Sequence, residues 1–516
     1  MLKFGLSLVL YCWLPLAGLA QLQSTQFPPH KLNKDTMLLD MSRLTSRDFA
    51  GRGTGHEGYQ RAAEMVAGKL AAFDFEYFEQ PDRAPDHNPY FLSVPYKGEQ
   101  LRDAHFKVGK AAFGFGTGFY PGSSLPKQPL QFGEIVFVGF GQESVHYSDF
   151  NGTSIKDKWV VAMPGRVDSL GKWQVAELRQ QYRSLMQKGA AGVILVNPNF
   201  DKEVKAVVSR LKHERVSLLE TVDESGETVR QPIPLLLISP KAAKKLYKQM
   251  RINAKKQYKQ RLKDKGGKPV AAIIAGSLEV DQYVRSFDAP NVIGFVRGEE
   301  KPDEYVLLSA HLDHLGEHDG EIYYGADDNG SGSAALLSIA RELSSWLQAG
   351  IRPRRSIAIV WFSGEENGLL GSKWLANHAP MPTDMITTNI NVDMIGRSDS
   401  RHKPDQKYIY VIGADRISRE LHEVGEAVNE QCCQLELDYT YNDPKDPNRY
   451  YYRSDHYNFA KQGIPSVFYF SGVHADYHRP TDTMDKIDFN RMLYLTEYIL
   501  YTGWELANRA ERLIIN

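Results

Sequence analysis

EYVLLSAHLDHLG, at residues 304–316, begins the part of the sequence that decides the fold. It is followed by YYGADDNGSGSAALLSIAREL at 323–343 and SIAIVWFSGEENGLLGS at 356–372. The first and third stretches each contain a continuous apolar run, which is typical of a parallel strand buried on both faces. The second stretch repeats apolar side chains at helical spacing. A strand, a helix and a strand in this order predict a β-α-β unit of an α/β sheet.

Metal-binding types of side chain stand at the ends of these elements. The first strand runs into His311 and Asp313, the second into Glu365 and Glu366, and residues 327–329 (Asp-Asp-Asn) precede the helix. Open α/β sheets bind ligands outside the carboxyl ends of their strands, where these groups fall. Several carboxylates buried in one crevice repel one another unless a cation neutralises them. The spacing therefore predicts a metal site.

Two later strand ends add ligands of the same kind. Asp393 follows the end of a predicted strand at 390–392, and His478 follows the predicted strand IPSVFYF at 464–470. Histidine and carboxylate ligands without a usable thiol pair suit zinc, with manganese or cobalt as substitutes. A carboxylate shared by two ions about 3.5–4 Å apart would make a two-metal hydrolytic centre. The set therefore predicts hydrolysis of a polar bond by activated water.

Composition indicates a globular protein with more than one core. The chain has 516 residues, 42% hydrophobic and 24% charged, and its 62 basic and 63 acidic residues give a formal net charge of −1. This balance argues against nucleic acid or an anionic membrane surface as the main partner. Residues 251–268 are strongly basic, which we interpret as a solvated helical face.

The N-terminus is expected to be a secretory signal. Lys3 precedes an apolar run at residues 6–16, and Gly18-Leu19-Ala20 supplies small residues for cleavage near Ala20. The apolar run is shorter than the roughly 20 residues of a membrane span. We expect a secreted or periplasmic protein that keeps only Cys432 and Cys433, as a vicinal disulfide or as two free thiols.

Several motifs resemble the M28 family of zinc metallopeptidases, which includes leucyl aminopeptidases and glutamate carboxypeptidases. They are SAHLDH, GADDNGSG, SGEENGLLGS, NVDMIG, RSDHYNF and DYHRPTDT, with GRGTGHEG upstream. A segment between them, carrying GEIVFVGFG and KGAAGVILV, resembles a protease-associated (PA) domain. The resemblance implies a mixed, mostly parallel twisted sheet flanked by helices, of zinc exopeptidase type, with an inserted, mainly β, PA-like domain.

This resemblance implies a division of the chain. It comprises a signal peptide (1–20), an N-terminal arm (21–35), the first part of the peptidase domain (36–125), the PA-like insert with a connecting segment (126–280) and the zinc peptidase domain (281–516). Apolar patterns predict short strands at 91–94 and 106–113, and helical spacing predicts helices at 57–73, 418–430 and 489–509.

The resemblance also implies a ligand set for two zinc ions. One ion would be held by His311, Asp327 and Asp393, and the other by Asp327, Glu366 and His478, so that Asp327 bridges them. The peptide between Asp327 and Asp328 would be cis. Asp313 would orient His311 as a carboxylate behind it.

The same resemblance assigns catalytic roles. Glu365 would be the general base that takes a proton from water and returns it to the leaving amine. Tyr477 would steady the oxyanion, with a merely packed aromatic ring as the alternative. Residues 454–456 (Ser-Asp-His) are interpreted as pocket structure, because neighbours in sequence do not form a triad by adjacency. The remaining histidines of the motifs, His314, His318 and His474, are interpreted as rim residues.

The expected function is that of a secreted dinuclear zinc exopeptidase, most simply an aminopeptidase. A glutamate-carboxypeptidase-like enzyme is an alternative, because Arg449, Arg453 and Arg479 near the motifs are candidates for binding a substrate carboxylate. A single-zinc glutaminyl cyclase and a non-catalytic, receptor-like protein are further alternatives. Peptide substrates are the expected partners, with no nucleic acid and no stable membrane insertion. The sequence indicates no particular oligomeric state.

Overall fold

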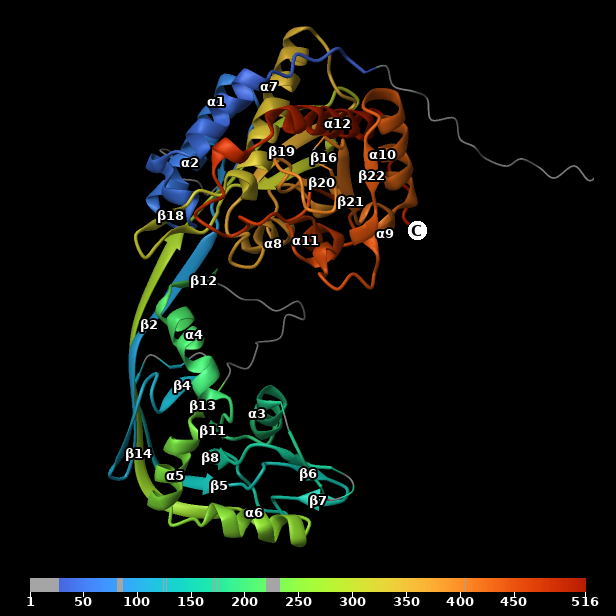
Figure 1. Cartoon of the computed structure of the whole chain (residues 1–516). Helices are drawn as coiled ribbons and strands as arrows, with labels where there is room; N and C mark the ends of the chain where they lie inside the picture. The colour runs from blue at the N-terminus through green and yellow to red at the C-terminus, as the bar shows by residue number, and fades with distance from the viewer. Residues whose placement is uncertain are drawn as a thin grey trace, which may run out of the picture.

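The chain folds into two bodies joined by two long strands (Figure 1). A computed structural model describes residues 27–80, 87–123, 125–126, 128–168, 170, 172–175, 177–219, 233–403 and 405–516. We call the upper body in Figure 1 the α/β domain (residues 27–92 and 289–516) and the lower body the inserted domain (residues 95–288). The expected signal peptide lies outside the described residues.

The α/β domain is built on one mixed sheet, which has eight strands among the described residues, in the order β1-β15-β19-β16-β20-β23-β21-β22. Strands β19, β16, β20 and β23 at its centre are parallel, and β15 and β21 are antiparallel to them. The strand bounds are β1 (Phe91–Leu92), β15 (Asn291–Val296), β16 (Lys301–His311), β19 (Arg355–Phe362), β20 (Ile386–Val392), β21 (Tyr408–Ile412), β22 (Glu436–Asp438) and β23 (Ser466–Phe470). The predicted mixed, mostly parallel α/β sheet is confirmed.

Helices cover both faces of this sheet, which explains its continuous apolar runs. In β19, Ile357 and Ile359 join the core beneath the larger helical layer, whereas Ala358 and Val360 join the core on the opposite face. The larger layer contains α1 (Lys34–Leu44), α2 (Glu57–Ala72), α7 (Gly332–Gln348), α10 (Arg419–Cys432) and α12 (Phe489–Asn508). The smaller layer contains α8 (Leu370–Asn377) and α11 (His456–Ala460), and α9 (Ala414–Ile417) follows β21. The helices predicted from the sequence are confirmed within two residues at each end.

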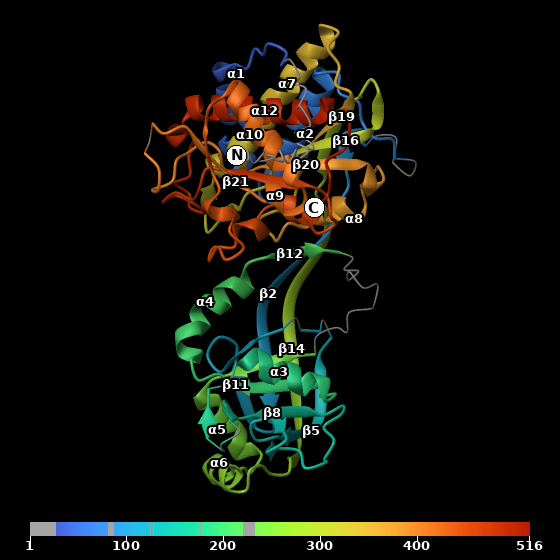
Figure 2. The ribbon, with the colours of Figure 1, turned by 90° about the vertical axis from the view of Figure 1, so that its right-hand side faces the viewer.

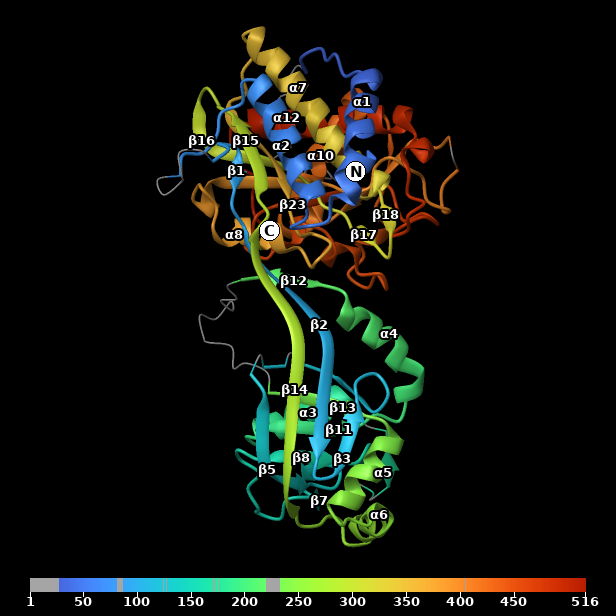
Figure 3. The ribbon, with the colours of Figure 1, turned by 90° about the vertical axis from the view of Figure 1, so that its left-hand side faces the viewer.

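The inserted domain has its own sheet, with the strand order β12-β2-β14-β5-β8-β11-β13-β4 and β3 paired to β2. Its bounds are β2 (Pro95–Val108), β3 (Ala111–Gly114), β4 (Phe119–Pro121), β5 (Leu130–Phe137), β8 (Trp159–Ala162), β11 (Gly192–Val196), β12 (Arg215–Leu218), β13 (Leu235–Ile238) and β14 (Val270–Asp288). Strands β2 and β14 run antiparallel over almost their whole length and carry the chain out of the α/β domain and back (Figure 3). The sheet therefore begins at Pro95, upstream of residue 126. The strand predicted at 91–94 is found as β1 over its first two residues, and the strand predicted at 106–113 is divided between the end of β2 and β3.

Among the described residues, four helices pack on the inserted sheet, namely α3 (Leu178–Gln187), α4 (Phe200–Lys212), α5 (Pro240–Gln249) and α6 (Ala254–Lys263) (Figure 2). Short two-stranded ribbons pair β6 (Glu143–Ser144) with β7 (Tyr147–Ser148) and β9 (Arg166–Val167) with β10 (Trp173–Gln174). A buried ion pair fixes α6 to the domain, since Arg261 Nη1 lies 2.5 Å from Asp149 Oδ1. The structure thus has a separate β-rich domain, and its relation to protease-associated domains stays a prediction.

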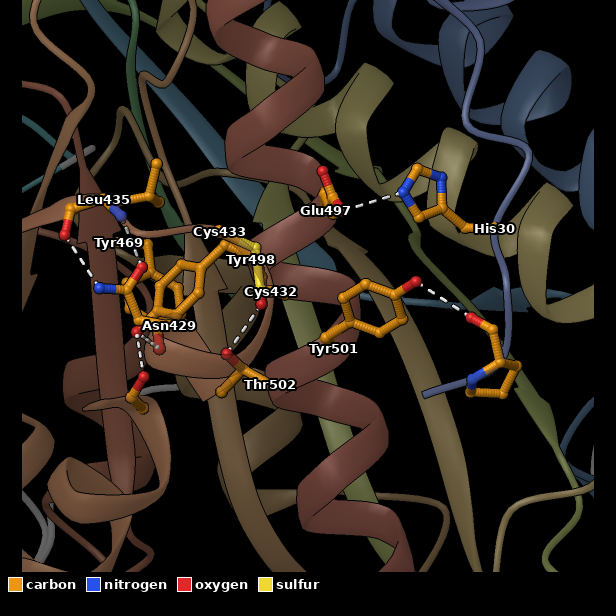
Figure 4. The surroundings of a disulfide bond; sticks show 12 residues. His30, Asn429, Cys432, Cys433, Leu435, Tyr469, Glu497, Tyr498, Tyr501 and Thr502 are labelled. Atoms are coloured by element: carbon orange, nitrogen blue, oxygen red, sulfur yellow. Dashed lines mark hydrogen bonds and ion pairs between the residues drawn. A yellow bond between two sulfur atoms is a disulfide. The ribbon is translucent and has the colours of Figure 1, made fainter. Parts of the chain in front are cut away.

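Cys432 and Cys433 form a vicinal disulfide at the end of α10 (Figure 4). Of the two predicted alternatives, the structure therefore has the vicinal disulfide and not the two free thiols. Asn429 holds the turn that follows, because its side chain donates to the carbonyl of Leu435 at 2.9 Å and accepts from the Leu435 N–H at 2.8 Å.

The first described residues of the chain are held against helix α12 of the α/β domain. His30 Nε2 lies 3.1 Å from Glu497 Oε1, and Tyr501 donates to the carbonyl of Pro28 at 3.0 Å (Figure 4). Within the described residues, every helix is too short or too polar to cross a bilayer.

Candidate metal and catalytic site

The carboxyl ends of the parallel strands bring the predicted ligands together. His311 ends β16 and Asp393 follows β20, and His311 Nε2 lies 3.4 Å from Asp393 Oδ1. Glu365 follows β19, and its Oε2 lies 3.9 Å from the same imidazole nitrogen. Ligand atoms of these three residues lie within 4.8 Å of one another, which makes them one candidate metal-binding group.

Asp328 connects this group to a second one. Its Oδ1 lies 3.4 Å from His311 Nε2, and its Oδ2 lies 3.1 Å from His478 Nε2. The resemblance placed Asp327 between the two groups, whereas in the structure the side chain that lies there is that of Asp328. The cis peptide is likewise Asp328–Asn329 rather than Asp327–Asp328. Both aspartates lie in the turn Ala326–Ser331, before α7.

The second group contains two histidines. Glu366 Oε2 lies 3.0 Å from His478 Nε2, and Glu366 Oε1 lies 2.7 Å from His314 Nδ1. Although burial opposes it, the neighbouring carboxylates of Asp328 and Glu366 raise the pKa of His478 to about 10. His314 is buried, and with Asp328 and Glu366 it forms the other candidate metal-binding group, so its interpretation as a rim residue is wrong.

Asp327 has a different environment from its neighbour. Its Oδ1 accepts from the N–H of Gly396 at 2.6 Å, and its Oδ2 lies 3.2 Å from His474 Nε2. Asp482 accepts from the N–H groups of Asp327 and Asp328, at 3.0 and 3.2 Å. Asp327, His474 and Asp482 therefore hold the turn that presents Asp328, and His474 is not a rim residue. Gly325 begins this turn at φ +55°, where a Cβ would lie 2.2 Å from the carbonyl oxygen of Asp328.

Asp313 acts on both sides of the site. His311 Nδ1 lies 3.0 Å from the backbone carbonyl oxygen of Asp313 but 3.9 Å from its carboxylate. The carboxylate accepts instead from the N–H of Glu365 at 3.1 Å and from the hydroxyl of Thr54 at 2.8 Å. Asp313 thus orients His311 through its main chain and fixes the turn of Glu365 and Glu366 through its side chain. Burial raises the pKa of Asp313 to about 6.

The GRGTG motif supplies a buried cation behind the metal-binding turns. The Arg52 guanidinium is inaccessible to solvent and donates to the carbonyls of Leu312, Gly325, Leu44 and Tyr324 at 2.7–2.9 Å. Burial lowers the pKa of Arg52 to about 10, so it stays protonated at neutral pH. Arg52 therefore ties the turn after His311 to the turn that begins at Gly325.

We expect Arg52→Met to lower the stability of the α/β domain by about 3–5 kcal/mol, because it leaves several buried carbonyl oxygens without a donor. Arg52→Lys should recover little, since an ammonium group lacks the planar fork that reaches carbonyls on both turns. Thermal unfolding would measure the loss. Arg61→Met is the matched control, because this arginine is exposed and its contacts with Glu57 and with the carbonyl of Asp48 are open to solvent, so that the expected cost is about 0.5 kcal/mol or less. Equal melting temperatures for the two methionine variants would contradict the role of Arg52.

A narrow pocket lies beside the carboxylates of the candidate metal site. It is lined by Asp328, Glu365, Asp393, Met394, Tyr450, Arg453, Phe468, Phe470, Val473 and Tyr477. Arg453 Nη2 donates to the hydroxyl of Tyr477 at 3.3 Å, and the Tyr477 ring stacks on His478 with 3.8 Å between ring centroids. Of the three arginines considered in the sequence analysis, only Arg453 lines this pocket. The hydroxyl of Tyr477 thus lies beside the carboxylate site, as an oxyanion donor would.

The Ser-Asp-His run at 454–456 supports the site from behind. Ser454 donates to Asp393 Oδ2 at 2.7 Å and accepts from the Asn391 side chain at 2.8 Å. Asp455 and His456 are buried. His318 lies on the hairpin of β17 (Gly316–His318) and β18 (Glu321–Tyr323), where its ring is 5.6 Å from that of His213 in the inserted domain. These positions agree with a structural role for the run and a peripheral position for His318.

Sequence reasoning missed Asp328, His314 and Asp482 as site residues. Asp328 and His314 stand inside the motifs GADDNGSG and SAHLDH, but these motifs do not show which of their polar side chains reach the site. Asp482 stands in DYHRPTDT, where it accepts from two main-chain N–H groups across the site. Its spacing from His478 carries no such information, and only the folded turn reveals it.

Known proteins resemble the chain in this region. The sequence profile of Peptidase family M28 matches residues 291–503. A probable glutamate carboxypeptidase VP8 of Zea mays is 40% identical over 104 residues, which are 20% of this chain and 14% of the relative. A probable leucine aminopeptidase of Arthroderma otae is 29% identical over 237 residues, which are 44% of this chain and 61% of the relative. The chain thus spans less than two thirds of the length of either relative.

The structure also resembles a solved one. An aminopeptidase from Aneurinibacillus sp. strain AM-1 has a TM-score of 0.52 at 18% identity, and the likeness covers 94% of this chain and 96% of that chain. At this identity the likeness concerns the fold, and it covers the α/β domain together with the inserted domain.

Proposed function

Because residues 291–503 belong to peptidase family M28, we propose that the protein is a dinuclear zinc exopeptidase, acting as an aminopeptidase that releases N-terminal residues. The observation that carries the proposal is the pair of histidine–carboxylate groups connected by Asp328, with Glu365 beside them. The named relatives include a leucine aminopeptidase and a glutamate carboxypeptidase, which supports peptide substrates.

The residues present fit two zinc ions. Asp328 Oδ2 and His478 Nε2 are buried and lie 3.1 Å apart without the geometry of a hydrogen bond, as expected of two atoms directed at one cation. Imidazole and carboxylate donors are those that zinc takes in hydrolytic sites. We assign His311, Asp328 and Asp393 to one ion, and Asp328, Glu366 and His478 to the other. His314 holds Glu366 in place through Nδ1.

The chain's own residues then have defined roles. Zinc held by these ligands would supply an acidified water molecule and a positive charge beside the carbonyl of the peptide bond. Glu365 takes the proton from the attacking water and delivers it to the leaving amine. The Tyr477 hydroxyl donates to the oxygen that gains negative charge, and Arg453 holds that hydroxyl in the pocket. Burial raises the pKa of Glu365 well above its usual range, which suits a group that must accept and release a proton.

One observation favours a second candidate, a carboxypeptidase of the same architecture. Three carboxylates line the pocket: Asp328 and Asp393 are assigned to the zinc ions, and Glu365 is assigned as the base. Arg453 is the one cationic residue among the described residues of the lining. A substrate ammonium group would find no further carboxylate among them, whereas a substrate carboxylate would find Arg453. A single-zinc cyclase is less well supported, because both ligand groups are complete.

A panel of dipeptides tests the proposal. We expect cleavage of peptides with a free amine, including C-terminal amides, at least about 100-fold faster than cleavage of N-acetylated peptides, and loss of cleavage with a chelator. Release of amino acids from N-acetylated but not from C-amidated peptides would favour the carboxypeptidase instead. Zinc content measured on the same preparation should be two ions per chain, and one ion would favour a cyclase.

Secretion is part of the proposal, and its support is the N-terminal sequence of residues 1–20. Zinc is the proposed resident metal, with manganese or cobalt as substitutes.

A further inference from the structure

The inserted domain concentrates positive charge that the net charge of the chain conceals. Residues 241–268 contain twelve Lys or Arg residues and a single Asp, a net charge of +11, so the rest of the chain carries −12. These residues form α5, α6 and the turn that follows α6. Residues 251–268, predicted from the sequence to be a solvated helical face, are thus part of a larger basic surface.

We call this surface the basic end, and define it by its eleven exposed cations. They are Lys241, Lys244, Lys245, Lys248, Arg251, Lys255, Lys256, Lys259, Lys263, Lys265 and Lys268. The twelfth, Arg261, is buried against Asp149. None of the eleven makes an ion pair with a carboxylate of the described residues, whereas many surface cations elsewhere in the protein do. Their mutual repulsion therefore lacks compensation within the part of the chain that the structure describes.

The geometry of the basic end is that of a broad outer surface. In Figures 1 and 3, α6 lies across the end of the inserted domain farthest from the α/β domain, and α5 lies next to it. Tyr258 and Leu262 on the inner side of α6 pack on the core, while Lys255, Lys256 and Lys259 are exposed. None of the large hydrophobic side chains exposed among the described residues lies in this segment.

We propose that the basic end binds the surface of an anionic lipid bilayer peripherally, by electrostatic attraction without insertion. Cations spread over two helices and a turn match a plane of lipid phosphates, and clustered Lys and Arg side chains are attracted to the negative surface of an anionic leaflet. Recognition of single-stranded nucleic acid would instead use aromatic side chains for base stacking, and no aromatic ring is among the exposed residues of the basic end. Bound in this way, the protein would hold its α/β domain away from the bilayer.

This proposal does not depend on the peptidase activity, and its test measures binding alone. The full mature chain is mixed with vesicles of phosphatidylcholine, with or without phosphatidylglycerol, and the bound fraction is measured by sedimentation. We expect binding only to vesicles that contain phosphatidylglycerol, and its loss at about 0.5 M salt, because salt screens exposed charges. The triple variant Lys255→Glu, Lys256→Glu and Lys259→Glu should bind at least about tenfold more weakly.

A matched variant separates the basic end from net charge. Lys202→Glu, Lys205→Glu and Lys212→Glu change the charge by the same amount on α4, and this variant should bind like the unaltered protein. Circular dichroism checks that both variants are folded. Equal weakening by the two variants, or no binding of the unaltered protein to anionic vesicles, would overturn the proposal. Binding to dextran sulfate but not to vesicles would assign the surface to a polyanionic polymer. A dimer that the α6 variant alone dissociates would assign it to a second copy of the chain.

Discussion

Asp328→Ala is expected to abolish peptide hydrolysis and to remove most of the zinc, whereas Asp327→Ala is expected to keep zinc. Asp328 presents one oxygen to His311 and the other to His478, at 3.4 and 3.1 Å. Removing a carboxylate shared by two ions takes a ligand from each site and leaves the remaining carboxylates to repel one another. We therefore expect loss of both ions and a fall in activity of at least about 1,000-fold.

Asp327 makes the sharper control because it is the neighbouring residue of the same type. Its carboxylate accepts from Gly396 and lies against His474, so its loss should weaken the turn without removing a ligand atom. Asp327→Asn keeps an oxygen for the Gly396 N–H and should retain two zinc ions and most of the activity. Zinc would be counted by atomic spectroscopy after dialysis, and activity measured on the same samples. A zinc-free Asp327→Asn protein beside a zinc-loaded Asp328→Asn protein would restore the assignment made from the sequence.

The contrast between these aspartates shows what local sequence determines. The β-α-β unit could be predicted because strands buried on both faces need continuous apolar runs, as residues 357–362 provide. The His, Asp and Glu residues at the carboxyl ends of those strands then predicted the edge of the sheet at which the metal ligands gather. The choice between Asp327 and Asp328 depends on backbone torsions within a single turn, and adjacent side chains there face different neighbours. Sequence spacing carries no information about those torsions.

Two other features lay beyond prediction for a related reason. His314 was interpreted as a rim residue, but Glu366 lies 2.7 Å from its ring, and this contact joins two different strand ends. The long antiparallel pairing of strands β2 and β14 was not predicted either. Their side chains do not alternate regularly between buried and exposed, because the two strands run from one domain to the other and do not cover a single core. In both cases the deciding contacts join residues that are far apart in the sequence, and the pattern of a single segment cannot predict such contacts.

Glu365→Gln is expected to lower kcat by about 100- to 10,000-fold while zinc binding persists. The substitution keeps the size of the side chain and removes its capacity to take a proton. The Glu365 N–H still donates to Asp313 at 3.1 Å, so the turn that carries both glutamates should remain in place. A change in kcat without loss of zinc is the signature of a base rather than a ligand.

Glu366→Gln provides the matched comparison for the base. Glu366 contacts His478 and His314, so its amide variant should lose affinity for one zinc ion and recover part of its activity when zinc is added in excess. Glu365→Gln should not respond to added zinc, because its defect is in proton transfer. If Glu365→Gln instead lost zinc and was rescued by it, Glu365 would be a ligand of the group it forms with His311 and Asp393. The base would then have to be sought among the other carboxylates of the pocket.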